Sequence, residues 1–294
     1  MDNRVHFKTM WLGILLVVPQ GLLVFTFFYW PAGAALFWAF TLEQPWGGGN
    51  EFVGLDNFVN VFSDSFYWAA VWRSIVFAVS AAGLGMLVAL VLALFCDRQL
   101  RGYAYYRTAL VWPYAVAAPA AAVAFRYVFA PEAGVFSALN EIYPNLWNPG
   151  MNGTHAMIMI IIAYSWKYIA YNFIFFLAGL QSIPRALVEA GAMDGAGVLR
   201  RMRDIQLPLL APTFFFLLVI NLTDSFVDSF GIIDITTEGG PSKATELMVY
   251  KIYFDGFKGL DYSGASAQSI VLMMLVMALT ILQFRYVERK IHYK

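Results

Sequence analysis

Long apolar stretches alternate with shorter polar ones along most of this 294-residue chain. An α-helix rises about 1.5 Å per residue, so about 20 apolar residues cross a hydrocarbon layer of roughly 30 Å. Stretches of sufficient length and hydrophobicity occupy residues 11–40, 73–95, 105–129, 155–180, 208–233 and 265–286. The pattern therefore predicts an all-α polytopic membrane protein with six transmembrane helices.

Prolines interrupt two of these stretches. Pro113 and Pro119 lie inside the third stretch, and Pro208 and Pro212 open the fifth. Proline lacks a backbone N–H and its ring clashes with the preceding turn, so it favours a kink or the start of a helix. We expect breaks in the helix at both places.

The connection at residues 182–208 has more internal pattern than a simple link between two spans requires. Ser182 is expected to cap a short helix, which Gly195 ends. A second short helix is expected at residues 198–205, stopping before Pro208. The connection is therefore predicted to fold as helix, glycine turn and helix.

The composition agrees with a membrane protein. Hydrophobic residues make up 60% of the chain and charged residues 13%, about half the charged fraction of roughly 25% in an average soluble domain. The first apolar stretch is too long for the core of a signal peptide, so we expect it to remain as the first span.

Basic residues are distributed unequally between the two sides of the predicted bundle. The connections on one side contain only Lys243, Lys251 and Lys258, all between the fifth and sixth spans. The other side holds Arg4, Lys8, Arg98, Arg101, Arg107, Arg185, Arg200, Arg201, Arg203, Arg285, Arg289, Lys290 and Lys294. Since lysine and arginine accumulate in cytoplasmic loops, both termini are expected in the cytoplasm.

Several function classes lack support in the sequence. The formal net charge of +0 argues against a nucleic-acid-binding protein, which would carry a basic face. The chain contains no G-x-x-x-x-G-K-[ST], H-E-x-x-H, G-x-S-x-G or CxxC pattern, and its three histidines are dispersed. We therefore expect no catalytic residues, no metal site and no ATP hydrolysis in this chain.

Polar residues form a stripe on the fifth span. Asn221, Asp224, Ser225 and Asp228 are three or four residues apart, which places them on one helical face. Carboxylates at membrane depth are costly and mark candidate functional sites. The stripe is expected to face a partner helix, a water-filled path or both.

The fourth span carries a second polar group, which includes Lys167, Tyr171 and Asn172. Lys167 lies near mid-span, too deep to reach the interface easily. It is expected either to pair with an acidic residue such as Asp224 or Asp228, or to contact an anionic substrate. In the neighbouring spans, Arg126 is expected to extend toward the interface, and Arg73 to lie in it.

The connection at residues 182–208 resembles the E-A-A-x-x-D-G-A…I-x-L-P loop of bacterial ABC-importer permeases. The matching residues are Glu189, Ala190, Asp194, Gly195, Ala196, Ile205, Leu207 and Pro208. Two positions depart from the pattern. Gly191 replaces an alanine and is expected to add flexibility, and Met202 replaces an aromatic residue expected to fill the groove of an ATPase.

Further stretches resemble the carbohydrate-uptake branch of this family. Residues 54–58 are similar to its G-L-x-N-F element, and residues 239–250 to its G-G-P…A-T…L…Y element. Residues 112–117, 166–173, 266–269 and 283–288 contain stretches that resemble members importing a phosphate ester of glycerol.

The resemblance implies a type I permease fold in a bacterial inner membrane. Residues 1–10 and 288–294 would be cytoplasmic tails, and residues 11–287 the transmembrane domain with the coupling loop at 182–208. The implied partners are a second homologous permease, two copies of a cytoplasmic ATPase that bind ATP and magnesium, and an extracytoplasmic solute-binding protein. No cofactor is implied in this chain.

The resemblance assigns a set of ATPase-coupling residues, and the polar residues inside the spans give a second set. The expected ATPase-coupling set is Glu189, Ala190, Gly191, Asp194, Gly195, Ala196, Met202, Ile205, Leu207 and Pro208. The expected substrate-pathway set is Lys167, Tyr171, Asn172, Asn221, Asp224 and Asp228. The alternatives are a permease of this class for a neutral sugar or polyol, and an ion-coupled secondary transporter that uses Asp224 and Asp228. A membrane-embedded enzyme has no supporting motif.

Overall fold

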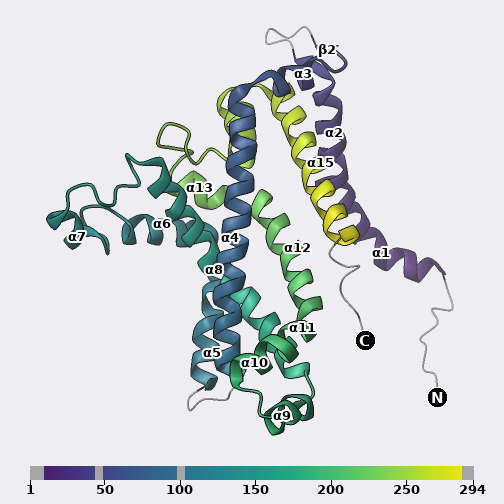
Figure 1. Ribbon diagram of the computed structural model, residues 1–294. Coiled ribbons are helices and arrows are strands. Elements are labelled where there is room, and N and C mark those ends of the chain that lie inside the picture. Colours follow the sequence, from purple (N-terminus) through teal and green to yellow (C-terminus); the bar gives the residue numbers. More distant parts are fainter. Residues whose placement is uncertain (1–9, 44–48, 98–102, 287–294) are drawn as a thin grey trace. The chain divides into compact units, whose positions relative to one another are not determined.

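A computed structural model describes residues 10–43, 49–97 and 103–286 (Figure 1). The predicted tails, residues 1–10 and 288–294, therefore lie outside the described residues except for Met10. The chain divides into two compact units. The first comprises residues 1–64 and 252–271, and the second comprises residues 65–251 and 272–294.

The first unit contains the first apolar stretch, which is helical from Met10 to Ala39. Helix α1 (Met10–Val24) passes through a π-helical turn, η1 (Phe25–Tyr29), into α2 (Trp30–Ala39). Pro31 is in the first turn of α2, where the missing N–H costs least. The predicted first span at residues 11–40 is confirmed to within one residue at each end.

A short hairpin and a helix follow α2. Strands β1 (Thr41–Glu43) and β2 (Asn50–Phe52) pair antiparallel, with Leu42 opposite Glu51. The side-chain amide of Asn57, in α3 (Asp56–Ser63), donates hydrogen bonds to the carbonyls of Ala39 and Thr41 at 3.0 and 2.9 Å. The buried Asn57 thus satisfies the carbonyl of the last residue of α2 and that of the first residue of β1.

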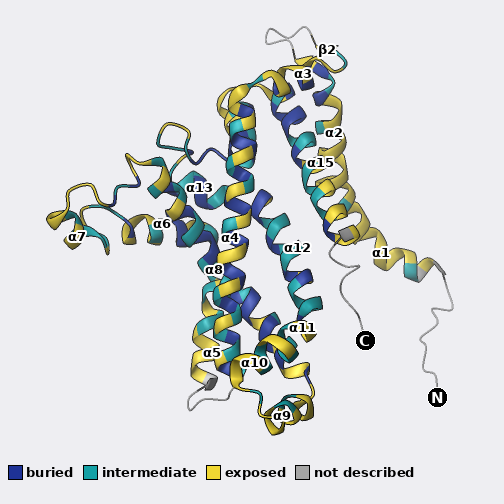
Figure 2. Ribbon diagram, viewed as in Figure 1, coloured by how far each residue is buried: buried dark blue, intermediate teal, exposed yellow. Residues whose placement is uncertain are grey.

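The second unit is built around three helices, α4 (Ser65–Asp97), α8 (Gly153–Ser182) and α12 (Ala211–Val227), which pack against one another (Figure 1). Alanines form much of the buried face between α4 and α8, and Figure 2 shows dark blue positions recurring along α4 between exposed ones. A Cβ added at Gly85 would be in ordinary van der Waals contact, 3.5 Å from Asn172 Nδ2. Small residues permit this close approach in a bilayer, where packing drives helix association.

The third and fifth stretches are broken, as their prolines predict. Helix α5 (Tyr103–Val111) and turn η2 (Trp112–Ala115) are followed by α6 (Ala118–Val128), with a bend of 104° at the break. The segment Val198–Leu209 meets α12 at 66°. Among the described residues, four helices can span a membrane unaided, and the count reaches six if each bent pair is one span.

Two predicted boundaries are wrong. The second span begins at Ser65, so Arg73 lies inside α4 and not at its start. The fifth stretch is not one helix, because α12 ends at Val227 and α13 (Phe230–Thr236) begins after a short break. Asp228, the last member of the polar stripe, therefore caps the end of α12.

The remaining elements connect these helices. Helix α7 (Ser137–Ile142) lies in the loop between α6 and α8. Helix α14 (Met248–Tyr253) leads through the π-helical turn η4 (Phe254–Lys258) to α15 (Tyr262–Tyr286), the sixth apolar stretch. The connection between α8 and α12 contains α9 (Arg185–Met193), α10 (Val198–Arg201), turn η3 (Met202–Gln206) and α11 (Leu207–Leu209).

Candidate functional site

The connection between α8 and α12 folds as helix, glycine turn and helix. Helix α9 ends in a Schellman motif: Ala196 N–H donates to Gly191 O at 2.9 Å, and Gly195 N–H donates to Ala192 O at 3.1 Å. Gly195 has φ +79°, a conformation that glycine adopts without a Cβ clash. The D-G-A sequence at residues 194–196 is therefore the physical end of α9.

Two details of this connection differ from the sequence prediction. Ser182 is the last residue of α8, where its hydroxyl donates to Gly179 O at 2.7 Å, and Pro184 precedes α9. The second helical segment continues through Pro208 to Leu209. It can do so because η3 is a π-helical turn, in which Leu207 N–H reaches back to Met202 O and widens the backbone before the proline ring.

Gly191 brings the two arms of the connection together. A Cβ placed at Gly191 would lie 2.8 Å from Ile205 Cδ1 and 3.5 Å from Arg201 Cγ. Gly191 thus allows close packing between α9 and the segment that carries Ile205, a role that the expectation of flexibility did not include.

Replacing Gly191 with alanine is expected to give no net stabilisation of the assembled transporter, because the overlap of the new methyl with the end of the Ile205 side chain offsets the gain of about 0.5–1 kcal/mol from removing a glycine inside a helix. Ile205→Val removes that Cδ1 atom. The double variant should therefore cost less than the sum of the two single variants. Thermal unfolding of the four combinations measures this coupling, and strictly additive effects would contradict the packing role.

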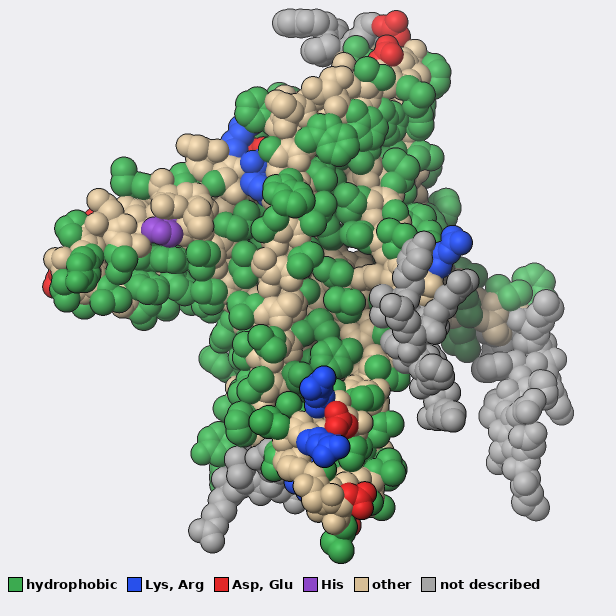
Figure 3. Space-filling model, in the orientation of Figure 1, with side chains coloured by type: hydrophobic (Ala, Val, Ile, Leu, Met, Phe, Trp, Pro, Cys, Tyr) green, Lys and Arg blue, Asp and Glu red, His purple; other side chains and the backbone are tan. Residues whose placement is uncertain are grey.

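The surface of this connection is available for a partner. Met193 and Leu199 are 89% and 75% exposed, whereas Met202 is half-buried. Glu189 is exposed and forms no ion pair with a described residue. Figure 3 shows charged side chains gathered over α9 and α10, below a largely hydrophobic stretch of the second unit. The predicted coupling set did not include Met193 and Leu199. Apolar residues in a charged loop could have indicated them as contact residues.

The other expected coupling residues lie on the same connection. Asp194 and Pro208 are exposed, Ala190 is exposed on α9, and Ala196, Ile205 and Leu207 are partly buried. The structure therefore gathers the whole predicted coupling set in one protruding element. Their contact with an ATPase remains a prediction.

A pair of asparagines joins α8 to α12. Asn172 and Asn221 exchange side-chain hydrogen bonds at 3.0 and 2.7 Å, and both are almost completely buried. Asn221 also donates to Leu217 O at 2.7 Å. For Asn221 the structure therefore shows the partner-helix arrangement, in which neighbouring polar groups satisfy each other away from lipid.

Tyr168 connects the two carboxylates of the stripe. Its hydroxyl lies 3.3 Å from Asp224 Oδ2 and 3.1 Å from Asp228 Oδ2. Asp224 is half-buried and Asp228 is exposed. One hydroxyl proton cannot satisfy both carboxylates fully, so both retain free acceptor oxygens. The predicted pathway set omitted Tyr168, although it lies one turn before Asn172 on the same face of α8.

Lys167 and Tyr171 complete the polar group on α8. Lys167 is half-buried and is close enough to Asp224 for an electrostatic interaction, but it forms no ion pair with any described residue. The ring of Tyr171 stacks on Tyr114, with centroids 5.8 Å apart. Of the six predicted pathway residues, the structure thus places Lys167, Asp224 and Asp228 around accessible polar surface.

A loop between α13 and α14 is fixed to α4 by charge. Glu246 is buried between Arg73, whose guanidinium is 4.0 Å from its carboxylate, and Lys243, whose ammonium is 3.7 Å away. Arg73 Nε also donates to Glu246 O at 3.1 Å, and Met248 N–H donates to Ser74 Oγ at 2.8 Å. Arg73 therefore anchors this loop, which the expectation of an interfacial arginine did not anticipate.

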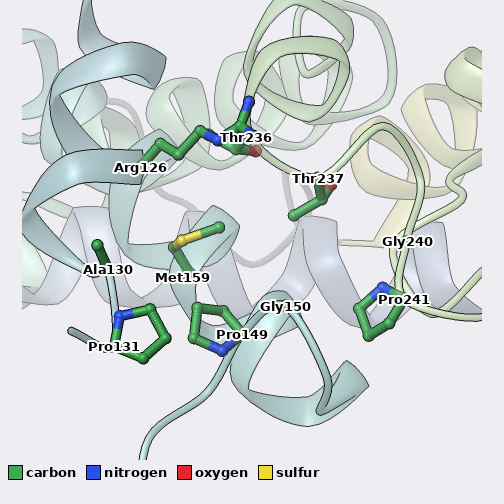
Figure 4. A pocket seen from close by; sticks show the side chains of 10 residues that line it. All are labelled: Arg126, Ala130, Pro131, Pro149, Gly150, Met159, Thr236, Thr237, Gly240 and Pro241. Atoms are coloured by element: carbon green, nitrogen blue, oxygen red, sulfur yellow. The ribbon is translucent and has the colours of Figure 1, made fainter.

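A cavity of about 360 Å³ opens beside the same loop (Figure 4). Arg126 extends along one side of it toward Thr236, and Met159 and Pro241 line other parts. Arg126 donates from its guanidinium to Ile235 O at 3.2 Å. The sequence analysis expected Arg126 to extend toward the membrane interface, and it did not predict this cavity.

In the part of the chain that the structure describes, no three His, Cys, Asp or Glu side chains come together to hold a metal ion. The α9 connection offers mechanical contact with a partner. The polar groups around Lys167 and Arg126 offer hydrogen bonding and electrostatic attraction.

Comparisons with known proteins agree with this arrangement. The chain is 47% identical to the sn-glycerol-3-phosphate transport system permease protein UgpA of Yersinia enterocolitica over 293 residues, covering 100% of this chain and 99% of that one. The Escherichia coli protein of the same name is also 47% identical, with the same coverage. These relatives are permease subunits, in agreement with the absence of catalytic motifs.

Two solved structures share the fold. A bacterial ABC transporter involved in the import of the acidic polysaccharide alginate matches with a TM-score of 0.81 at 22% identity, covering 95% of this chain and 96% of that one. The MetNI methionine ABC transporter matches with a TM-score of 0.57 at 15% identity, covering 79% of this chain and 100% of that one. Both support the type I permease fold.

The family described as binding-protein-dependent transport system inner membrane component matches residues 9–293. Together with several apolar helices, this makes the protein a multi-pass membrane protein, as expected. The chain belongs to the family of inner membrane components of binding-protein-dependent transport systems.

Proposed function

We propose that this chain is one permease subunit of an ATP-driven importer for sn-glycerol 3-phosphate or a related glycerophosphodiester. The main support is the 47% identity, over essentially the whole length, to permeases named for that substrate. The second permease, two ATPase copies and a solute-binding protein complete the system. ATP and magnesium bind to the ATPase, and this chain carries no cofactor.

The polar surface between α8 and α12 suits such a substrate. Lys167 supplies a cation without an ion-pair partner among the described residues, and a phosphate group is its natural ligand. Asp224 and Asp228 supply free acceptor oxygens for the hydroxyl groups of glycerol. The substrate would therefore bind with its phosphate toward Lys167 and its hydroxyls toward the carboxylates.

The connection that contains α9 would transmit the conformational change of the ATPase to the transmembrane helices. Its protruding apolar side chains, Met193 and Leu199, suit a groove on a soluble protein. Glu189 would form a polar contact beside them, and the Schellman turn at Gly195 would keep α9 at a fixed angle to the second arm. Such a rigid helical hairpin can pass a displacement of the ATPase to α8 and α12.

This role requires a particular orientation in the membrane. We infer that the α9 connection and both termini face the cytoplasm, because lysine and arginine accumulate on that side. The loop anchored by Glu246 and the cavity beside Arg126 then face outward, toward the solute-binding protein. Cysteine labelling of intact cells at positions 193 and 243 would test this topology.

Substrate choice is tested by uptake into proteoliposomes that contain the complete importer. We expect uptake of sn-glycerol 3-phosphate to exceed that of neutral sugars and polyols. Preferential uptake of a neutral polyol would favour the alternative in which Asp224 and Asp228 bind hydroxyl groups and Lys167 is only their structural counter-ion.

Lys167→Met is expected to reduce uptake of sn-glycerol 3-phosphate by about tenfold or more, since a hydrogen bond to a charged group contributes about 1.5–3 kcal/mol. The matched variant Lys167→Arg retains the charge and should retain more activity. The measurement is the uptake rate at saturating solute-binding protein. An equal loss for charged and neutral substrates would assign Lys167 to a structural ion pair.

A further inference from the structure

The cavity beside Arg126 has the chemistry of an anion site. Of the described residues that line it, Arg126 alone carries a charge, and the rest are apolar, glycine, proline or threonine. No described carboxylate forms an ion pair with Arg126. Its guanidinium has five N–H donors, and the structure assigns one hydrogen bond to it, to Ile235 O. Several donors therefore remain available to a ligand.

The cavity lies along the same helix as the polar surface between α8 and α12. Met159 in the cavity wall and Lys167 are both on α8, eight residues apart. That spacing corresponds to about 12 Å along the helix axis and a rotation of about 80°, so the two positions are about a quarter turn apart around α8.

An aromatic contact joins α6 to α8 next to the two cationic residues. Phe125, next to Arg126, packs edge-on against Trp166, next to Lys167, with ring centroids 5.4 Å apart. The cavity wall at Met159 and the position of Lys167 are about 12 Å apart along α8, which suits two successive binding stations better than one continuous site.

We propose that the Arg126 cavity is an outer binding station for the phosphate group of the substrate, occupied before the substrate reaches Lys167. This inference rests on the proposed function and adds a second phosphate-binding position to it. The volume of about 360 Å³ lies within the range of small-molecule pockets, and Arg126 is the group that fixes the phosphate end.

The test measures phosphate binding directly, without the solute-binding protein. The assembled permease pair with its ATPases, in lipid nanodiscs, is titrated with inorganic phosphate, with sn-glycerol 3-phosphate and with glycerol. Arg126→Gln is expected to raise the dissociation constant for both phosphate-containing probes by about tenfold or more. Arg126→Lys should raise it less, and glycerol should bind too weakly to detect in every variant.

Tyr127→Phe is the matched control, because Tyr127 is the next residue of α6, is 68% exposed and does not line the cavity. It should leave phosphate binding unchanged. Unchanged binding in Arg126→Gln, or loss of binding only in Lys167→Met, would overturn the proposal. Weaker capture of the solute-binding protein with unchanged phosphate affinity would also overturn it, by assigning the cavity to protein docking.

The two phosphate probes separate the possible sources of the anion. A substrate station should bind sn-glycerol 3-phosphate at least as tightly as inorganic phosphate, and tighter binding of inorganic phosphate would contradict it. Uptake by the unmodified importer tests the proposed function separately. A wild-type importer that does not carry sn-glycerol 3-phosphate would fail that test, whatever the titration shows for Arg126.

Discussion

Deleting residues 191–197 is expected to abolish substrate-stimulated ATP hydrolysis and transport while leaving membrane insertion intact. The deletion removes the last turn of α9, the Schellman motif and the contact between Gly191 and Ile205. The remaining chain would still contain all the apolar stretches that insert into a bilayer. ATPase activity of the assembled complex with and without loaded solute-binding protein measures the effect, and normal stimulation would contradict the coupling role of this connection.

Two glycine substitutions provide a matched pair for this prediction. Gly195→Ala forces a residue with a Cβ into φ +79°, which costs about 1–2 kcal/mol. Gly197→Ala is the control, because Gly197 has φ −64° and nothing lies within 4 Å of an added Cβ. Coupling should weaken in the first variant only.

Glu246→Gln is expected to weaken the attachment of the loop between α13 and α14 to α4 and to lower both thermal stability and uptake. The substitution leaves the partly buried guanidinium of Arg73 without its carboxylate, since the two are paired at 4.0 Å. Removing one partner of a buried ion pair is strongly destabilising, and with Arg73 and Lys243 partly exposed we expect a loss of about 2 kcal/mol. Thermal unfolding of the assembled importer in nanodiscs measures it.

Lys243→Gln is the control for this prediction. Lys243 is 48% exposed at its side chain, and a pair with one exposed partner contributes about 1 kcal/mol or less. The destabilisation should therefore be clearly smaller than that of Glu246→Gln. Equal destabilisation by the two variants would contradict the prediction, because it would show that the ion pair between Arg73 and Glu246 adds nothing to stability.

The parts of the fold that could be predicted from sequence are those fixed by solvent and local geometry. A helix that crosses the hydrocarbon layer needs a long apolar stretch, so the sequence predicted the spans. The differences from the structure lie mainly at the ends of the helices. Proline chemistry located the breaks between Pro113 and Pro119 and between Pro208 and Pro212. The glycine at position 195 ended α9 because few other residues adopt its backbone conformation.

The parts that sequence did not predict depend on contacts between distant segments. The close approach at Gly191 needs the position of Ile205, and the anchoring of Glu246 needs an arginine 173 residues earlier in the chain. Likewise, Tyr168 becomes a partner of Asp224 and Asp228 only once α8 and α12 are packed. The cavity at Arg126 combines residues from three helices and two loops. No local sequence pattern therefore predicts it.

The central claim is that ATP hydrolysis by partner subunits, transmitted through the α9 connection, drives uptake of a phosphorylated glycerol through this permease. Its most direct test is uptake of radiolabelled sn-glycerol 3-phosphate into proteoliposomes that contain both permeases and the ATPase, supplied with the solute-binding protein. The account predicts uptake that requires ATP and the ATPase and is unaffected when proton and sodium gradients are collapsed. Uptake driven by an ion gradient in the absence of the ATPase would contradict it.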